Sequence, residues 1–157
     1  MAARSQATME LSDEIRWILK VKGGSVWSVS PWESVYEAIA AMSERQVGAL
    51  PVMEGGRLVG IISERDYARR VILKGRSSKE TQIAEIMTTP VVYVTPEATV
   101  QGCMRIMTAN RVRHLPVVED GRVVGIISIG DLVNWIISAQ EDAINQLHSY
   151  IAGKYPG

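Results

Sequence analysis

Residues 60–66 read Gly-Ile-Ile-Ser-Glu-Arg-Asp, and residues 125–131 read Gly-Ile-Ile-Ser-Ile-Gly-Asp. In both places a β-branched apolar run stops at a serine, and an acid follows three residues later. This order is typical of a strand that turns directly into a helix. The sequence therefore predicts two strand-to-helix junctions that are built alike.

The similarity extends well beyond these two stretches. At a constant offset of 65 residues, segments 26–73 and 91–138 align without a gap, and 19 of the 48 aligned positions are identical. Shared prolines, glycines and apolar residues make up most of these matches. A fixed internal offset of this kind indicates duplication of one structural unit.

Each copy predicts the same order of elements, β-α-β-β-α. The opening strands are expected at 26–29 and 91–94, before a Ser-Pro or Thr-Pro stop signal. The first helices carry apolar residues at helical spacing, namely Val35, Ile39 and Met42, and Val100, Met104 and Met107. Gly-Gly or Asp-Gly turns join the hairpin strands, which are expected at 49–53 and 57–62, and at 115–118 and 122–127. The closing helices are expected at 64–73 and from 129 to about 151.

The predicted fold class is α+β, with two βαββα repeats related by a pseudo-twofold axis and with additional N- and C-terminal helices. The expected boundaries are an N-terminal tail and helix at 1–21, repeat 1 at 22–73, a linker at 74–81, repeat 2 at 82–138, and a C-terminal helix extension and tail at 139–157.

The two appended helices are predicted from apolar stripes: Leu11, Ile15, Ile18 and Leu19 at one end, and Leu132, Ile136, Ala143, Leu147 and Ile151 at the other. These stripes fit a dimer surface and packing on the chain's own module equally well.

Composition excludes several classes of function. The 157 residues contain 17 Lys plus Arg and 17 Asp plus Glu, so no basic excess favours nucleic acid. No apolar run reaches the roughly 20 residues of a membrane helix. One cysteine and two histidines offer no zinc set, and Cys103 fits a helix core better than a nucleophile.

The chain shows no P-loop and no acid/base constellation, so we expect a protein that is not an enzyme. The single cysteine fits a reducing, cytoplasmic location. Whether an organelle transit peptide preceded residue 1 is left open.

The paired Ser/Asp motifs predict a nucleoside-phosphate site. Ser63 and Ser128 sit where free backbone N–H groups attract phosphate, and Asp66 and Asp131 offer two acceptor oxygens for a ribose diol. The same spacing also fits a helix capping box, and one protein can use both arrangements.

The predicted strands at 49–53 and 115–118 contain Leu-Pro-Val, at residues 50–52 and 115–117. A proline donates no ladder hydrogen bond, so it leaves backbone groups and flat apolar surface free to meet an adenine ring. The proline also fits the simpler role of starting the strand.

The duplicated Gly-Ile-Ile-Ser-x-x-Asp motif, the Leu-Pro-Val strands and the Val-x-Pro openings resemble a tandem pair of cystathionine-β-synthase (CBS) domains, a Bateman module, over about residues 22–140. The resemblance implies a stand-alone regulatory protein that binds AMP, ADP, ATP, NAD(H) or S-adenosylmethionine in the cleft between the repeats, with AMP favoured and no metal. It also implies a homodimer that acts on a separate, unidentified partner protein. A ligand-independent oligomer or scaffold is the alternative.

The residue-level reasoning and the resemblance together select the candidate ligand-binding residues. They are Lys22, Val26, Ser28, Ala49, Leu50, Pro51, Ser63, Arg65, Asp66, Arg69, Thr88, Val92, Arg113, His114, Leu115, Pro116, Ser128, Gly130 and Asp131.

The two sites are not expected to be equal. Arg65 and Arg69 are placed to neutralise phosphate in the first copy, whereas Gly130 replaces Arg65 in the second. Arg113 and His114 supply the second copy's polar groups beside its proline strand. The first site is therefore predicted to prefer phosphate-rich ligands.

Overall fold

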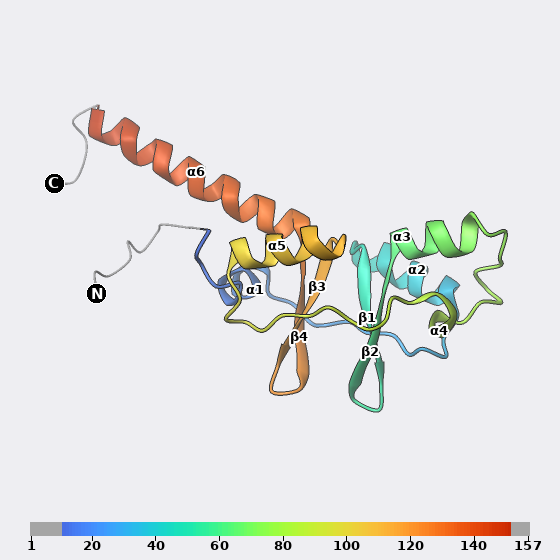
Figure 1. Cartoon of the computed structure of the whole chain (residues 1–157). Coiled ribbons are helices and arrows are strands. Elements are labelled where there is room, and N and C mark those ends of the chain that lie inside the picture. Colours follow the sequence, from blue (N-terminus) through green and yellow to red (C-terminus); the bar gives the residue numbers. More distant parts are fainter. Residues whose placement is uncertain (1–10, 152–157) are drawn as a thin grey trace. The chain divides into compact units, whose positions relative to one another are not determined.

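A computed structural model describes residues 11–151, with side chains to residue 149. The chain divides into two compact units. The first, here called the hairpin unit, comprises residues 24–95 and 114–126. The second, the helical unit, comprises residues 11–23, 96–113 and 127–151 of the described chain. Figure 1 shows the elements of both.

Two antiparallel hairpins form the sheets of the molecule (Figure 1). Their strands are β1 (Ala49–Glu54), β2 (Arg57–Ser63), β3 (His114–Glu119) and β4 (Arg122–Ser128). Both turns use positive φ at two successive residues, Gly55 and Gly56 in one hairpin and Asp120 and Gly121 in the other. That backbone twist matches the twist of the strands it joins. The predicted hairpins are confirmed.

The opening strands are shorter than predicted. Of segments 26–29 and 91–94, only Val29 and Val94 pair, each through a single parallel bridge to its own hairpin, at Val52 and Val117. The Val29 N–H donates to the Pro51 carbonyl, and its own carbonyl accepts from Met53. Val26 is 39% exposed. Extending the strand to an exposed residue such as Val26 would bury little apolar surface.

The helices of the hairpin unit are α2 (Val35–Arg45), α3 (Glu64–Tyr67) and α4 (Ile83–Ile86), with a π-helical turn, η1 (Ala68–Ile72), continuing α3. Buried apolar side chains of these helices form one core with those of the opening segment, β1 and β2. Its members are Val29, Val35, Ala38, Met42, Leu50, Val52, Ile62, Val71, Ile83 and Ile86. The core of the first repeat thus includes α4, which follows the predicted linker and which the sequence did not predict.

The helical unit contains α1 (Arg16–Lys22), α5 (Val100–Asn110) and α6 (Ile129–Ile151). Both appended helices are therefore confirmed. Ile15, Ile18 and Leu132 are buried, whereas Leu11 is exposed. Of the predicted stripe on α6, Leu132 is buried and Ile136 is half-buried, whereas Ala143 and Leu147 are exposed, so the stripe is only partly an inner face. The side chain of Ile151 lies outside the described residues. The mixed composition and the repeated helix-hairpin-helix order confirm the predicted α+β fold class.

Candidate functional site

Asp66 is held at the start of α3 by the serine that precedes the helix. Its Oδ2 atom accepts hydrogen bonds from the Ser63 N–H and hydroxyl, both at 2.9 Å, and the Ser63 Oγ accepts from the Asp66 N–H at 3.1 Å. The capping box is therefore formed. Asp66 is only 8% exposed, so the bonds fix its carboxylate rather than leaving it to sample solvent.

The second oxygen of the same carboxylate receives a hydroxyl from a distant segment. Thr88 Oγ1 donates to Asp66 Oδ1 at 3.0 Å. The Thr88 backbone is fixed as well, because its N–H and carbonyl both pair with Ile61 on β2. Two side-chain hydroxyls, from Ser63 and Thr88, thus converge on one carboxylate. Each carboxylate oxygen can accept more than one bond, so this arrangement suits the vicinal hydroxyls of a ribose.

Asp131 begins α6 with the same local geometry but a different distant partner. Its Oδ2 accepts from the Ser128 N–H at 2.9 Å, and its N–H donates to Ser128 Oγ at 3.1 Å. The ammonium group of Lys22, the last residue of α1, donates to the same Oδ2 at 2.9 Å. The distant donor to the aspartate is therefore an ammonium group in the second copy and a hydroxyl group in the first.

These contacts cross the boundary between the repeats in sequence. Thr88 precedes the opening segment of the second copy but contacts the aspartate of the first. Lys22 precedes the opening segment of the first copy but contacts the aspartate of the second. Met87, the counterpart of Lys22 at the 65-residue offset, lies over Gly60 on β2. A Cβ at Gly60 would be 2.5 Å from the Met87 sulfur, so the glycine permits this approach.

The Leu-Pro strands contribute mainly by packing. Leu50 belongs to the core of the hairpin unit, and Leu115 is fully buried. Ala49, Pro51 and Pro116 are buried as well. The carbonyls of both prolines accept bonds from the opening segments. An adenine contact by these strands stays a prediction.

The arginines of the first copy differ in their surroundings. Arg65 is half-buried and Arg69 is exposed. Arg70 is exposed too, and it donates to the carbonyl oxygens of Ile86 and Met87 at 2.7 and 3.2 Å, which ties η1 to the end of α4. In the second copy Gly130 is exposed, so the cation nearest Asp131 comes from α1 and not from α6.

His114 lies at an unexpected place beside the first hairpin. A Cβ at Gly48 would be 3.1 Å from Glu64 Oε1 and 3.2 Å from His114 Nε2, so both side chains end close to this glycine. The second copy has Arg113 and Ile129 at the positions of Gly48 and Glu64. Sequence reasoning selected neither Gly48 nor Glu64. The glycine at residue 48, where the second copy has an arginine, was the sequence feature that could have indicated a close approach by other side chains.

The structure places the remaining candidates near the surface. Val26 and Ser28 are exposed in the first opening segment, Val92 is half-buried in the second, and Arg113 is exposed just before β3. The Arg113 carbonyl accepts from the Ile129 N–H at 2.9 Å. A ligand contact by these residues stays a prediction.

Three further observations bear on the chemistry of the chain. Burial raises the pKa of the Cys103 thiol to about 11, so this side chain is a packed thiol, as predicted, with almost no reactive thiolate. Among residues 11–151, no three His, Cys, Asp or Glu side chains gather closely enough to hold a metal ion. No helix within the described chain has both the length and the apolar character needed to cross a membrane.

Comparison with known proteins gives a consistent picture. The model of the CBS domain family matches residues 25–73 and again residues 83–138. The mitochondrial CBS domain-containing protein CBSX3 of Arabidopsis thaliana is 40% identical, and the alignment covers 98% of this chain and 79% of that protein.

Solved structures agree. A protein with CBS domains from Burkholderia ambifaria, whose proposed role is signal transduction, is 46% identical with a TM-score of 0.77, covering 82% of this chain and 96% of that one. A hexameric CBS-CP12 protein from bloom-forming cyanobacteria is 28% identical with a TM-score of 0.70, covering 76% of this chain and 69% of that one.

Proposed function

This chain belongs to the CBS domain family, and we propose that it is a regulatory module that binds an adenosine-containing ligand at its Ser/Asp motifs. The observation that carries this proposal is the Asp66 carboxylate, which is nearly buried and already accepts two side-chain hydroxyls. A ribose diol presents the same two donors. AMP is the first candidate, followed by ADP, ATP, NAD(H) and S-adenosylmethionine.

Regulation requires a change that a partner can read. A ligand shifts a conformational equilibrium only by its different affinities for the two states. The Thr88 hydroxyl and the Lys22 ammonium each join an aspartate to a segment far away in sequence. A ligand that takes over either aspartate loosens that connection, which gives binding a structural consequence. The module would act without catalysis, as a homodimer in the cytoplasm, on a separate protein.

The test is a calorimetric titration of protein shown to be free of nucleotide with AMP, ADP, ATP, NAD, NADH and S-adenosylmethionine. We expect micromolar binding of at least one compound and its loss in the Asp66→Ala or Asp131→Ala variant. Guanosine and cytidine nucleotides serve as controls for the base. Silence across the adenosine panel up to millimolar concentration would refute the proposal.

A second candidate function is a ligand-independent oligomeric scaffold. The observation that favours it is the set of exposed apolar side chains along α6. A scaffold would assemble fully without nucleotide, and its partner binding would survive substitution of both aspartates. A nucleotide-dependent change in partner affinity would instead support the regulatory module.

A further inference from the structure

Helix α1 has a structural counterpart in the other copy, and it is longer than that counterpart. At the start of α4, Ile83 donates its N–H to the carbonyl of Glu33. At the start of α1, Ile15 makes the same bond to Ala98, the repeat equivalent of Glu33. From these matched starts, α4 runs for four residues, whereas α1 continues to Lys22. Helix α1 is therefore about one turn longer than α4.

The extra turn carries the cation of the second site. It ends at Lys22, whose ammonium group donates to Asp131 Oδ2 at 2.9 Å. In the other copy, the shorter α4 is soon followed by Thr88, which gives Asp66 a neutral hydroxyl. Helix α1 also precedes residue 25, where the match to the CBS domain family begins. The lysine of this ion pair thus lies outside the matched domain.

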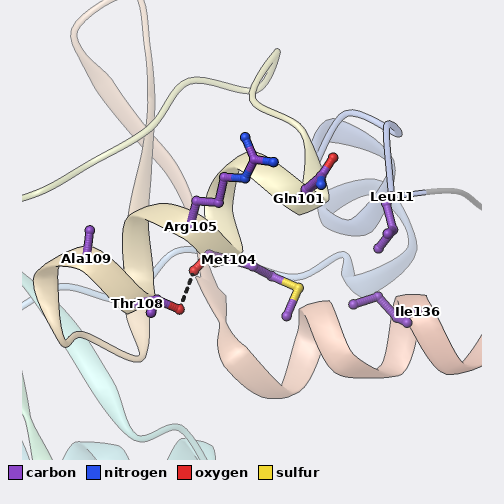
Figure 2. A pocket seen from close by; sticks show the side chains of 7 residues that line it. All are labelled: Leu11, Gln101, Met104, Arg105, Thr108, Ala109 and Ile136. Atoms are coloured by element: carbon purple, nitrogen blue, oxygen red, sulfur yellow. Dashed lines mark hydrogen bonds between the residues drawn. The ribbon is translucent and has the colours of Figure 1, made fainter.

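The start of α1 is held firmly in the helical unit. Ile15 is fully buried, and the neighbouring Glu14 pairs with Thr99 through an antiparallel bridge. In Figure 2, Leu11 is directed toward Ile136 of α6 across a shallow hollow that both residues line. These contacts fix the start of α1, so any movement of the helix occurs at its far end.

The end of α1 buries no side chain. Residues 20–28 are all exposed, and the exposed fraction of Val21 is 78%. Gly23 and Gly24 follow the helix with φ of 60° and 87°, and an added Cβ at either would lie in open space. Two glycines in this conformation form a point at which the backbone changes direction at low cost. A helix end without apolar packing depends on contacts such as the Lys22–Asp131 ion pair to stay in place.

The ion pair and a ribose compete for one carboxylate. Lys22 donates to the same Asp131 oxygen that accepts the Ser128 N–H. The side chain of Asp131 is 21% exposed, which limits the access that remains around it. A ribose diol that binds this carboxylate therefore weakens its bond to the ammonium group.

We propose that the last turn of α1 is a latch on the second site, which Lys22 closes and a ribose-bearing ligand opens. In the closed state, Lys22 holds the turn on Asp131 and competes with the ligand. In the open state, the two glycines let residues 20–28 move, up to the point where Val29 is bridged to Val52. The latch rests on the proposed function, because its ligand is the one proposed there. It adds a named moving segment by which the second site acts on the first copy.

A phosphate group on the ligand works against this opening. An ammonium group that leaves Asp131 can bind a phosphate oxygen instead, through a charge-assisted hydrogen bond. AMP offers Lys22 such a partner and adenosine does not. Adenosine therefore opens the latch further than AMP, and the latch distinguishes a nucleoside from a nucleotide.

The first experiment measures amide hydrogen exchange of residues 20–23 in protein without ligand. The Gly23 N–H, which donates to the Leu19 carbonyl at 2.9 Å, reports the opening of the last turn. The two site variants are Lys22→Met and Asp131→Asn, which keeps an oxygen for the capping bond. We expect each to raise exchange about two- to threefold, as for a partly exposed ion pair.

Lys20→Met is the matched control, because it removes a cation of the same turn that lies outside the ion pair. It should exchange at the wild-type rate. Wild-type exchange in both site variants, or an equal rise in the control, would overturn the latch.

The second experiment repeats the measurement with adenosine and with AMP, each at a concentration that saturates calorimetric binding. The protein carries Asp66→Ala, so that binding reports the second site. We expect exchange of residues 20–23 to rise about twofold with adenosine and by less with AMP. Exchange at residues 128–131 should fall with both.

The outcomes separate this proposal from the proposed function. Adenosine that binds and leaves residues 20–23 at the ligand-free rate would overturn the latch while the proposed function stands. Calorimetric silence of both probes would refute the proposed function at the second site, and the ligand-operated latch with it.

Discussion

Asp66 and Asp131 begin from the same motif and end in different chemical environments. Both carboxylates accept the backbone N–H of a serine three residues earlier, and the backbone N–H of each aspartate donates to the hydroxyl oxygen of that serine. A neutral hydroxyl from Thr88 completes the first site, and an ammonium group from Lys22 completes the second. The motif alone therefore fixes where each aspartate lies, while a distant segment supplies the further side-chain donor that its carboxylate accepts.

The difference has a direct consequence for ligands. A ribose diol can replace a hydroxyl donor on Asp66 with little change in electrostatics. On Asp131 it must share a carboxylate with a cation, although that cation is also placed to attract phosphate. Under the proposed function, we therefore expect the first site to recognise ribose through Asp66, with Arg65 as the cation next in sequence, and the second site to combine ribose and charge recognition at Asp131.

The largest expected effect comes from removing each carboxylate in turn. Asp66→Ala should weaken adenosine-ligand binding at the first site by about 100-fold, since two hydrogen bonds to a charged acceptor are lost. Asp131→Ala should leave that site intact. Calorimetry with AMP measures both, and thermal unfolding reports the separate cost of losing the carboxylate half of the capping box, about 1 kcal/mol. Equal loss of the same site in the two variants would show that the comparison is wrong.

A reciprocal exchange tests the role of Arg65. Arg65→Gly copies the second motif into the first, and Gly130→Arg does the reverse. The exchange at residue 130 is sterically mild, because an added Cβ there would lie 3.6 Å from its nearest neighbour, Ser128 Oγ. We expect the preference for ATP over AMP to fall about tenfold in the first variant and to rise at the second site in the other. An unchanged ratio of ATP affinity to AMP affinity in both variants would show that Arg65 does not contact the ligand's phosphates.

Thr88→Val tests the hydroxyl that completes the first site. The substitution keeps the shape of the side chain but leaves Asp66 Oδ1 without its donor, which should cost about 1 kcal/mol of folding stability. Urea denaturation measures the cost, and Thr88→Ser, which keeps the hydroxyl, is the control. A stability loss of equal size in the serine variant would attribute the effect to packing and not to the hydrogen bond.

Lys22→Met tests the cation of the second site. The ion pair is partly exposed, with side-chain exposure of 40% for Lys22 and 21% for Asp131, so stability should fall by only about 0.5 kcal/mol. Affinity for AMP should fall relative to affinity for adenosine, because only the nucleotide carries the phosphate that Lys22 attracts. Lys20→Met removes a neighbouring cation of α1 as the control. A parallel change in AMP and adenosine affinity would argue against a phosphate contact.

The sequence predicted the parts of this molecule that depend on local spacing. The Gly55-Gly56 and Asp120-Gly121 turns and the Ser63/Asp66 cap all involve residues within three positions of one another, and all are confirmed. The helix starts at Ser34 and Thr99 follow the same local logic.

Contacts between distant segments could not be predicted in this way. The Thr88–Asp66 bond spans 22 positions of sequence and the Lys22–Asp131 bond spans 109. No periodic pattern in the sequence predicts contacts over such separations. Helix α4 has only four residues, too few to show a helical repeat. The contacts between residues that only folding brings together are therefore the part of the candidate site that the structure was needed to show.

The smallest expected effect concerns the helices that precede or contain the distant donors: α4, which precedes Thr88, and α1, which ends at Lys22. Glu85 lies in the first turn of α4, where hydrogen bonds from the Gln82 N–H and then from the Arg76 guanidinium hold its pKa below the ordinary value of 4.5. The first turn of α1 has no acidic residue. Because the folded-state pKa is lowered, this contribution is present above the unfolded pKa and is lost as the pH falls through the folded value. The Glu85→Gln variant should therefore be slightly less stable than the wild type in urea near pH 6. The difference between the two free energies of unfolding should shrink toward pH 3. A gap that stayed constant between these pH values would show that the Glu85 charge does not hold α4.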